Sequence, residues 1–418
     1  MKKLIKTIIY KCPPLRRSAV RVRDRIDAHS YLRRYGSNKT DEKRILFCAY
    51  SGRQYACSPK AIYEELKKDQ TNEYRFVWAF KEKEKFAELA ADERTKLVTY
   101  GSKEFLKELS ICKYWVFNTR VPGGIVKKAD QVYVQTWHGT PLKRLGFDVA
   151  DYISNAADDK KSLRYSYSSD AKRYDFFLSP SPYYTKKMTS AFNLKALGKE
   201  DAILELGYPR NDSLYTASKE EILQIRNCLG IRPEEKVILY APTWRESALD
   251  PAKGSSYGKG IEFQLGLDLK KLLKDLGEEY KILLRTHYFI RDNIDFSAYG
   301  DRLMDVSDYR DINALYLAAD LLITDYSSVF FDYAILKKPM LFYMYDLDSY
   351  QGIRDFYIGL EELPGRIITR EEVLAAVIRQ SIADGIDQER YDKFNHTFNP
   401  YPGPVAKKVW DAIISQKG

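Results

Sequence analysis

Two of the chain's four histidines follow apolar, strand-like runs, and an imidazole can take up or release a proton near neutral pH. His138 lies in Trp137-His138-Gly139-Thr140-Pro141-Leu142-Lys143, after the run Val132-Tyr133-Val134, and His287 ends the stretch Leu283-Leu284-Arg285-Thr286-His287. Open α/β sheets bind their ligands at the carboxyl ends of the strands. The pair therefore predicts acid–base chemistry in a site built from two sheets. The alternative for either ring alone is a hydrogen-bonded histidine of the core.

A possible phosphate cradle follows another apolar run in the second half of the chain. Asp325-Tyr326-Ser327-Ser328 comes after Leu321-Leu322-Ile323-Thr324 and opens a predicted helix. Free backbone N–H groups at a helix start attract phosphate, and the hydroxyls of Ser327 and Ser328 add donors. Asp332, one helical turn later, could accept hydrogen bonds from ribose hydroxyls. The alternative is that one of the serines only caps the helix.

A third polar group follows the run Val237-Ile238-Leu239-Tyr240. Pro242 pre-sets the turn there, while Thr243 and Arg245 could face a diphosphate. Arg245 could equally form a surface ion pair. Together with Arg285 and Thr286, three strand ends of one predicted sheet offer hydrogen-bond donors, and in a doubly wound sheet such ends converge on one crevice.

Strand-like runs alternate with helical stretches along most of the 418 residues, which predicts parallel sheets covered on both faces. The chain is too long for one core. We expect a basic segment at 1–43, a Rossmann-like acceptor domain at 44–217 and a Rossmann-like donor domain at 218–400. Residues 401–418 are expected to form a last helix, which could pack back on the N-terminal domain.

The positive charge is concentrated at the N-terminus. Residues 1–44 carry 14 Lys or Arg and 4 Asp or Glu, whereas the remaining residues hold 54 of each sign. Leu4, Ile5, Ile8 and Ile9 form one helical stripe beside Lys2, Lys3 and Lys6, and a basic helix with an apolar face lies in membrane interfaces. We therefore expect residues 1–35 to bind an anionic membrane surface. The alternatives are a solvated basic arm and a nucleic-acid contact, and nothing downstream resembles a nucleic-acid module.

Several classes of protein are disfavoured by missing signals. The five cysteines include no C-x-x-C pair, which disfavours a zinc site and a disulfide framework and fits a reducing cytoplasm. The sequence contains no run of 18 apolar residues, which disfavours a membrane-spanning helix. The absence of a G-x-x-x-x-G-K-S loop and of G-x-G-x-x-G argues against ATPases and kinases.

The chain resembles the CDP-glycerol glycerophosphotransferase family of teichoic-acid synthesis. The resemblance covers roughly residues 45–400 and rests on five motifs in order. These are Trp137 to Lys143, Gly207-Tyr208-Pro209-Arg210-Asn211-Asp212, Tyr240-Ala241-Pro242-Thr243-Trp244-Arg245, Arg285-Thr286-His287, and the run from Ala319-Asp320 through Asp325-Tyr326-Ser327-Ser328, Asp332 and Lys338-Pro339 to Tyr343.

The resemblance implies a GT-B fold, in which two doubly wound Rossmann-like domains face a cleft. It also implies transfer of glycerol phosphate from CDP-glycerol to a hydroxyl of a polyprenyl-diphosphate-linked acceptor, with release of CMP, at the cytoplasmic face of the membrane. His138 would be the base, and His287 would stabilise the diphosphate or protonate the leaving group. The donor-binding residues implied are Gly139, Thr140, Pro141, Arg210, Pro242, Thr243, Arg245, Arg285, Thr286, Ser327, Ser328 and Asp332.

Other functions stay open at this stage. The donor could be CDP-ribitol, or a nucleotide sugar in an ordinary GT-B glycosyltransferase, and the chain could be a membrane-bound scaffold without activity. The sequence has no counterpart of the long N-terminal module of larger family members, so single-unit addition and polymerisation are both compatible with it. No cofactor is firmly implied; Asp325 and Asp332 could bind Mg²⁺, although two carboxylates alone are a weak metal signal.

Overall fold

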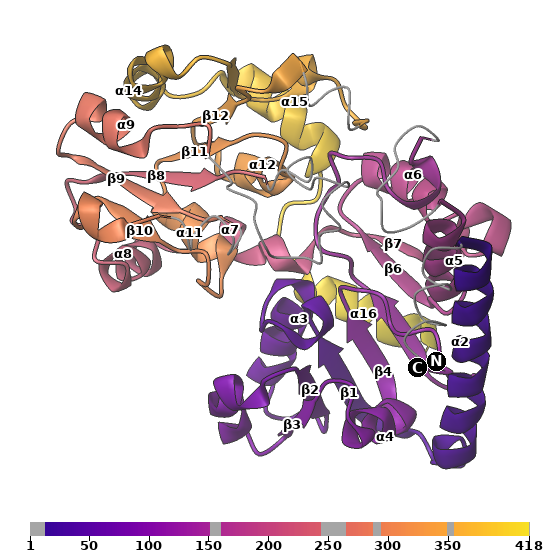
Figure 1. The fold of residues 1–418 in the computed structure, drawn as a ribbon. Helices are drawn as coiled ribbons and strands as arrows, with labels where there is room; N and C mark the ends of the chain where they lie inside the picture. The colour runs from indigo at the N-terminus through magenta and orange to yellow at the C-terminus, as the bar shows by residue number, and fades with distance from the viewer. Residues whose placement is uncertain (1–12, 151–159, 244–264, 287–293, 349–354, 418) are drawn as a thin grey trace. The chain divides into compact units, whose positions relative to one another are not determined.

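The computed structural model describes residues 13–150, 160–243, 265–286, 294–348 and 355–417, and these form two compact units (Figure 1). Unit 1 consists of residues 1–138, 145–212 and 403–418, and unit 2 of residues 139–144 and 213–402, within the described ranges. The division differs from the expected domain boundaries because residues 139–144 belong with unit 2. The C-terminal helix belongs with unit 1, in line with the expectation that it could pack back on the N-terminal domain.

Unit 1 is built on a seven-stranded sheet in the order β3-β2-β1-β4-β5-β6-β7. All its strand pairs are parallel. The strands are β1 (Asp41–Cys48), β2 (Arg75–Phe80), β3 (Thr95–Thr99), β4 (Cys112–Phe117), β5 (Val132–Gln135), β6 (Phe176–Ser179) and β7 (Ile203–Glu205). Almost every residue of β2, β4, β5 and β6 is buried, as expected for a parallel sheet covered on both faces.

Helices connect these strands and cover the sheet. They are α3 (Cys57–Lys68), α4 (Lys103–Ile111), α5 (Lys160–Ala171) and α6 (Pro182–Ala191), and the last helix of the chain, α16 (Ala406–Lys417), also packs in this unit. Trp410 of α16 lies in the unit 1 core, with its ring 5.0 Å from Tyr114 and 5.7 Å from Tyr74. The carboxylate of Asp212 accepts hydrogen bonds from the amides of Val405 and Ala406 at the start of α16, both at 2.8 Å.

The basic N-terminal segment is also part of unit 1 over its described residues. Helix α2 (Pro13–Tyr35) buries Tyr31, and the hydroxyl of Tyr35 donates to the Lys103 carbonyl of α4 at 3.3 Å. Earlier in α2, the carboxylate of Asp24 accepts a hydrogen bond from Tyr165 of α5. Residues 1–12, with the stripe of Leu4, Ile5, Ile8 and Ile9, lie outside the described residues.

Unit 2 holds a six-stranded sheet in the order β10-β9-β8-β11-β12-β13, again with parallel pairs. The strands are β8 (Lys236–Ala241), β9 (Tyr280–Leu284), β10 (Leu303–Asp305), β11 (Leu321–Thr324), β12 (Met340–Tyr343) and β13 (Arg366–Ile368). Its helices include α7 (Asp212–Thr216, starting in unit 1), α8 (Lys219–Cys228), α9 (Leu269–Leu276), α11 (Ile312–Ala318), α12 (Val329–Tyr333), α14 (Leu374–Asp384) and α15 (Gln388–Phe398).

The prediction of two doubly wound parallel sheets is therefore confirmed. That they face a common cleft stays a prediction. Among the described residues, no helix is long and apolar enough to cross a membrane.

Candidate active site

His138 lies at the carboxyl end of β5 in unit 1, in a turn that holds its ring in one orientation. The amide of Trp137 donates to the side-chain oxygen of Gln135 at 2.8 Å, and Trp137 adopts a left-handed backbone with φ 50°. The Nδ1 atom of His138 is 2.8 Å from the backbone carbonyl oxygen of Asn118. Because a carbonyl can only accept, Nδ1 must carry the hydrogen, and the neutral ring keeps its lone pair on Nε2. The atom free to take a proton is therefore Nε2.

The surroundings of His138 favour the neutral ring. Burial lowers the pKa of His138 to about 4 because it disfavours the imidazolium ion, although the hydrogen bond to Asn118 opposes this change. The positive charges of Arg210 and Arg120 lower the pKa further. At neutral pH the ring is thus unprotonated, as a general base must be before it acts.

Two aromatic rings flank the imidazole. The Trp137 ring stacks on it at 4.4 Å between centroids, and the Tyr50 ring is tilted against it at 5.7 Å. Trp137 is itself fixed by an edge contact with Phe192 at 5.0 Å. These rings cover part of the imidazole and contribute to its burial.

The position of His138 follows from the topology of the sheet. Strands β1 and β4 are neighbours at the centre of unit 1, and the chain proceeds from them toward opposite edges. The loops that follow these two strands diverge, and ligands of doubly wound folds bind where they do so. Asn118, the residue directly after β4, belongs to this switch point and holds His138 there.

Arg210 lies beside His138 in unit 1, although the resemblance assigned it to the donor. It comes from the single turn Pro209–Asn211 after β7, and its guanidinium donates to the His138 carbonyl oxygen. The same nitrogen is 3.9 Å from the sulfur of Cys57, and the Arg210 amide is 3.4 Å from the Ser58 hydroxyl. Within its own unit, Arg210 therefore fixes the backbone of His138 and adds positive charge near the ring. Its assignment to the donor stays a prediction.

In unit 2 the expected phosphate cradle also occupies the switch point, here between β8 and β11. One carboxylate oxygen of Asp325 accepts from the amides of Thr243 at 2.8 Å and of Tyr326 at 2.6 Å. The hydroxyl of Thr324 donates to the Ala241 carbonyl at 2.8 Å. These bonds join the two loops that carry the predicted donor-binding residues Pro242, Thr243, Ser327 and Ser328.

The alternative reading of Ser328 as a helix cap is not supported. Ser328 is the residue before α12, yet its side chain makes no capping hydrogen bond. Asp332 follows on the same short helix and is buried. The described residues contain no group of three or more His, Cys, Asp or Glu side chains that could hold a metal ion.

The segment after His138 is anchored in unit 2. The Leu142 carbonyl accepts from the Tyr357 amide at 2.8 Å, and the Arg144 amide donates to the Asp355 carbonyl at 3.0 Å. The side chains of Arg144 and Asp355 form an ion pair at 2.7 Å. Gly139, Thr140 and Pro141 therefore belong with the unit that carries the predicted donor residues.

The third predicted strand end is only partly described. The guanidinium of Arg285, after β9, donates to the carbonyls of Val306 at 2.8 Å and Tyr309 at 2.9 Å, so it braces the loop after β10. The Thr286 amide donates to the Ser307 hydroxyl at 3.1 Å. His287 and Arg245 lie outside the described residues.

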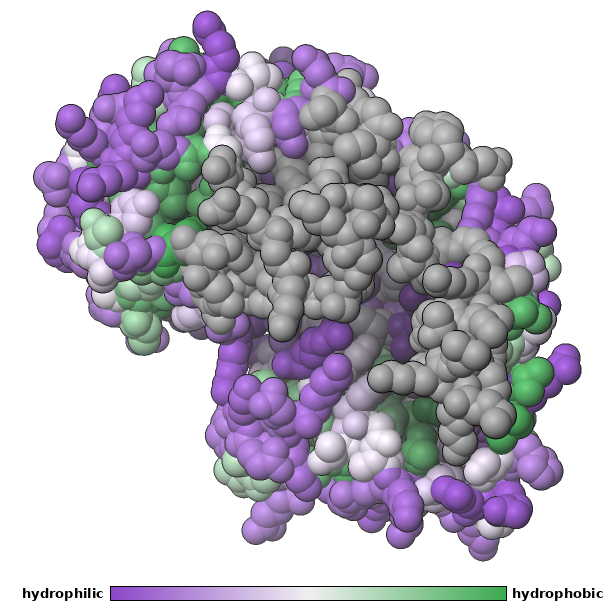
Figure 2. Space-filling view, in the orientation of Figure 1, coloured by the Kyte–Doolittle hydropathy of each residue, from purple (hydrophilic) through white to green (hydrophobic). Residues whose placement is uncertain are grey.

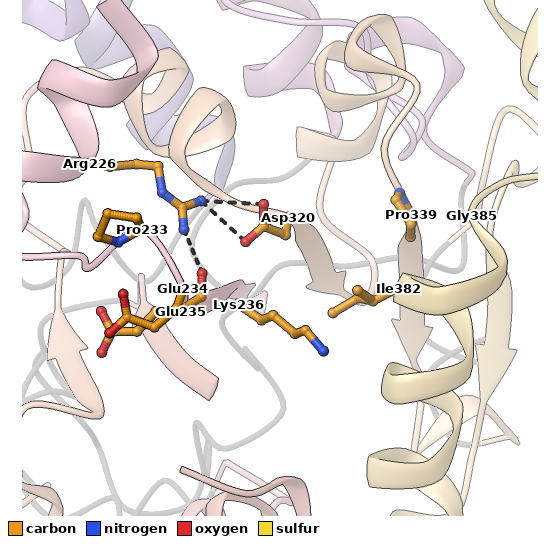
Figure 3. Close-up of a pocket in the computed structure, with 9 residues that line it drawn as sticks. All are labelled: Arg226, Pro233, Glu234, Glu235, Lys236, Asp320, Pro339, Ile382 and Gly385. Carbon is orange, nitrogen blue, oxygen red and sulfur yellow. Dashed lines mark hydrogen bonds and ion pairs between the residues drawn. The ribbon is translucent and has the colours of Figure 1, made fainter. Parts of the chain in front are cut away.

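A cavity of about 440 Å³ in unit 2 lies at the opposite edge of the sheet (Figure 3). Lys236 begins β8, while Asp320 and Pro339 directly precede β11 and β12, so this cavity marks the amino ends of the strands. Arg226 crosses its wall, bonded to the Asp320 carboxylate at 3.2 Å and to the Glu235 carbonyl at 2.6 Å. Ligands of such sheets bind at the other edge, so the cavity is not part of the candidate site.

Residues 30–415 match the protein family described as CDP-Glycerol:Poly(glycerophosphate) glycerophosphotransferase. The chain belongs to this family of transferases.

Curated relatives and solved structures agree with this family. A teichoic acid poly(glycerol phosphate) polymerase of Bacillus spizizenii is 39% identical over 90% of this chain and 92% of its own length. A polymerase of the same description from Staphylococcus epidermidis is 40% identical over 89% of this chain, but the chain spans only 50% of that relative. A solved structure of the wall teichoic acid polymerase TagF superimposes with a TM-score of 0.80 at 34% identity, covering 100% of this chain and 98% of that one.

Another solved structure of TagF, with a TM-score of 0.79 and 35% identity, is of a variant soaked with CDPG, and it covers 99% of this chain and 96% of that one. A teichoic acid poly(ribitol-phosphate) polymerase of Bacillus spizizenii matches less of the chain, with 33% identity over 56% of it and 39% of the relative.

The protonation of His138 can be measured directly by NMR titration of its imidazole carbons and nitrogens. We expect a neutral ring with hydrogen on Nδ1 at pH 7, and a pKa near 4 because of burial and two neighbouring cations. Arg210→Gln removes one cation and should raise the pKa, whereas Arg23→Gln on the exposed face of α2 should leave it unchanged. A ring that titrates at an unperturbed value, or a pKa insensitive to Arg210, would contradict this description.

Proposed function

We propose that this chain transfers glycerol phosphate from CDP-glycerol to a hydroxyl of a lipid-linked acceptor and releases CMP, in teichoic-acid synthesis. The observation that carries the proposal is His138, a neutral imidazole with Nε2 available, at the switch point of a chain from this transferase family. The likeness to TagF, one of whose structures was soaked with CDPG, supports the donor.

The proposed reaction is a direct displacement at the β-phosphorus of the donor. The acceptor oxygen forms the new P–O bond while its proton passes to Nε2 of His138. The bond from the β-phosphorus to the bridging oxygen breaks, and CMP leaves with that electron pair. Hydrogen-bond donors must stabilise the charge on the phosphoryl oxygens, and the loops tied by Asp325 supply candidates in Thr243, Ser327 and Ser328. His287 remains the predicted partner for the leaving group.

A donor bound close to His138 would also strengthen it as a base. A ring with a pKa near 4 is a weak base at neutral pH, since general bases work best with a pKa near the working pH. A nearby diphosphate favours the protonated ring and raises its pKa. The proposal therefore requires that the base of unit 1 and the donor groups of unit 2 reach the same substrate.

Glycerol is favoured over ribitol as the transferred polyol. The glycerol-phosphate polymerases are more similar to this chain, and over more of its length, than the ribitol-phosphate polymerase is. A nucleotide-sugar glycosyltransferase would share the fold but would release a nucleoside diphosphate.

The product mixture separates these possibilities. With CDP-glycerol and a defined lipid-linked acceptor, we expect CMP and an acceptor heavier by whole glycerol-phosphate units, as measured by nucleotide chromatography and mass spectrometry. His138→Ala should lower the rate about 100-fold or more, because it removes the general base. Release of CDP would refute the phosphotransferase, and a fully active His138→Ala would refute the base.

We also propose that the protein binds peripherally to the cytoplasmic leaflet, where a lipid-linked acceptor is anchored. Leu15, Val22 and Ile26 lie on one face of α2, because seven- and four-residue spacings return to the same side of a helix. These side chains are 50%, 53% and 63% exposed, whereas the opposite face of α2 packs on unit 1. Figure 2 shows hydrophobic residues alternating with hydrophilic ones along the place of α2.

The charge of α2 fits an anionic surface. Its exposed residues include Arg23 and Arg25 in the middle of the helix and Arg33 and Arg34 in its last turn. Each cation near an anionic leaflet contributes about 1 kcal/mol, and apolar side chains that leave water add to this. An apolar stripe bordered by arginines therefore supports interfacial binding.

Vesicle binding tests this surface. In a chain that begins at Pro13, replacing Leu15, Val22 and Ile26 by serine should reduce binding to phosphatidylglycerol vesicles about 10-fold or more, because less apolar area leaves water. The matched control is Leu223→Ser, which removes another half-exposed leucine, on α8, and should change nothing. Co-sedimentation gives both values, and unchanged binding by the triple variant would contradict the assignment.

A further inference from the structure

The turn after β1 has an unusual backbone. Tyr50, Ser51 and Gly52 follow one another with φ values of 49°, 55° and 79°, all in the left-handed region. For residues with a side chain this conformation costs free energy, and two such residues in succession are uncommon. Gly52 is required at its position, because a Cβ there would come within 2.8 Å of Tyr100 and 3.0 Å of the Lys81 amide.

Two side chains from the loop after β4 hold this turn in place. The side-chain oxygen of Asn118 accepts from the Tyr50 amide at 2.7 Å, and the Thr119 hydroxyl oxygen accepts from the Ser51 amide at 3.1 Å. Asn118 is 0% exposed, so its hydrogen bond to Tyr50 does not compete with water. The strain is thus retained by bonds across the switch point of unit 1.

The consequence of the left-handed turn is the placement of Tyr50 beside His138. The two ring centroids lie 5.7 Å apart with 59° between the ring planes. Tyr50 and His138 are both partly exposed, whereas Trp137, which stacks on the same imidazole, is buried. Asn118 acts on both partners, since its backbone carbonyl binds Nδ1 of His138 while its side chain binds the Tyr50 amide. Strain that a protein maintains next to a catalytic group is often part of its function.

We propose that Tyr50 contacts the acceptor alcohol, that its ring packs against the acceptor's carbon chain, and that it directs the hydroxyl toward Nε2 of His138. Asn118 is a positioning residue that fixes the ring and the tautomer of the base together. A tyrosine ring suits this task because it offers a large, rigid apolar face. The inference deepens the proposed function by identifying the acceptor side of the same site, and it rests on that function.

The left-handed φ allows a clean substitution, because glycine adopts this conformation without cost. Tyr50→Gly therefore removes the ring and preserves the turn, while Tyr50→Phe keeps the ring and removes only the hydroxyl. Each variant is assayed for CMP release with the lipid acceptor and, without acceptor, for slow transfer to water. Tyr50→Asn, which also tolerates a left-handed backbone, serves if the glycine variant does not fold.

We expect Tyr50→Gly to lower kcat/KM for the acceptor about 10-fold or more, since the alcohol loses its orientation. KM for the donor should stay at the wild-type level, transfer to water should not fall, and Tyr50→Phe, which keeps the ring, should lose much less of the acceptor kcat/KM than Tyr50→Gly does. Lys337→Gly is the matched control, because Lys337 has a φ of 50° in unit 2 and its replacement relieves the same strain far along the chain. It should raise Tm and leave KM for the acceptor unchanged.

Substitutions of Asn118 distinguish positioning from mere stability. Asn118→Asp keeps an acceptor for the Tyr50 amide but adds a negative charge near His138, so the acid limb of the pH profile should move to higher pH. Asn118→Ala should raise KM for the acceptor. A purely structural role would lower the amount of folded Asn118→Ala enzyme without raising its KM for the acceptor.

Wild-type acceptor kinetics in Tyr50→Gly, or an equal loss of transfer to water, would overturn the inference. Release of a nucleotide other than CMP by the wild type would instead overturn the proposed donor. In that case the acceptor KM of Tyr50→Gly would still decide the role of the ring.

Discussion

One side-chain oxygen ties two diverging loops at the centre of each sheet, and the candidate site depends on these two ties. In unit 1 the Asn118 side chain accepts from the Tyr50 amide, and in unit 2 the Asp325 side chain accepts from the Thr243 amide. Both accepting side chains are buried. Asn118 comes from the loop after β4, and Asp325 comes from the loop after β11. Each doubly wound sheet leaves a crevice at its switch point, and buried polar groups must be hydrogen-bonded, so each tie fixes the shape of the crevice in its own unit.

The two ties support different chemistry. The tie of unit 1 supports a neutral imidazole, which burial and two guanidinium groups keep unprotonated. In unit 2 the Asp325 carboxylate orders the backbone amides of Thr243 and Tyr326 next to hydroxyl side chains. Such a set of hydrogen-bond donors suits phosphate. The motif that contains His138 passes from one unit to the other at Gly139, and its next residues are anchored to Asp355 and Tyr357. The covalent chain thereby connects the base to the unit with the predicted donor groups.

Local sequence patterns were sufficient for the longer strands of both sheets and for the position of His138. Buried parallel strands are continuous apolar runs, and polar residues directly after them stand out, as at Thr243 and His138. Contacts over long sequence distances have no such pattern: Asn118 is 68 residues from Tyr50, and the Asp355–Tyr357 segment is too short to show periodicity. The strand β13 has only three residues and is likewise too short to show a periodic pattern. Arg210 shows what a motif does not reveal, since within unit 1 its guanidinium donates to the His138 carbonyl, while its role at the donor stays a prediction.

Binding of CDP-glycerol to two matched variants tests most directly whether the Asp325 bond supports the donor site while the Asn118 bond supports the base. Asp325→Ala and Asn118→Ala each remove one tie, in unit 2 and unit 1 respectively. Isothermal titration calorimetry on the folded variants should give a Kd about 10-fold or more weaker for Asp325→Ala, because the loops that offer donors lose their order. Asn118→Ala should retain the wild-type Kd. A donor affinity that survives Asp325→Ala but is lost in Asn118→Ala would contradict the account.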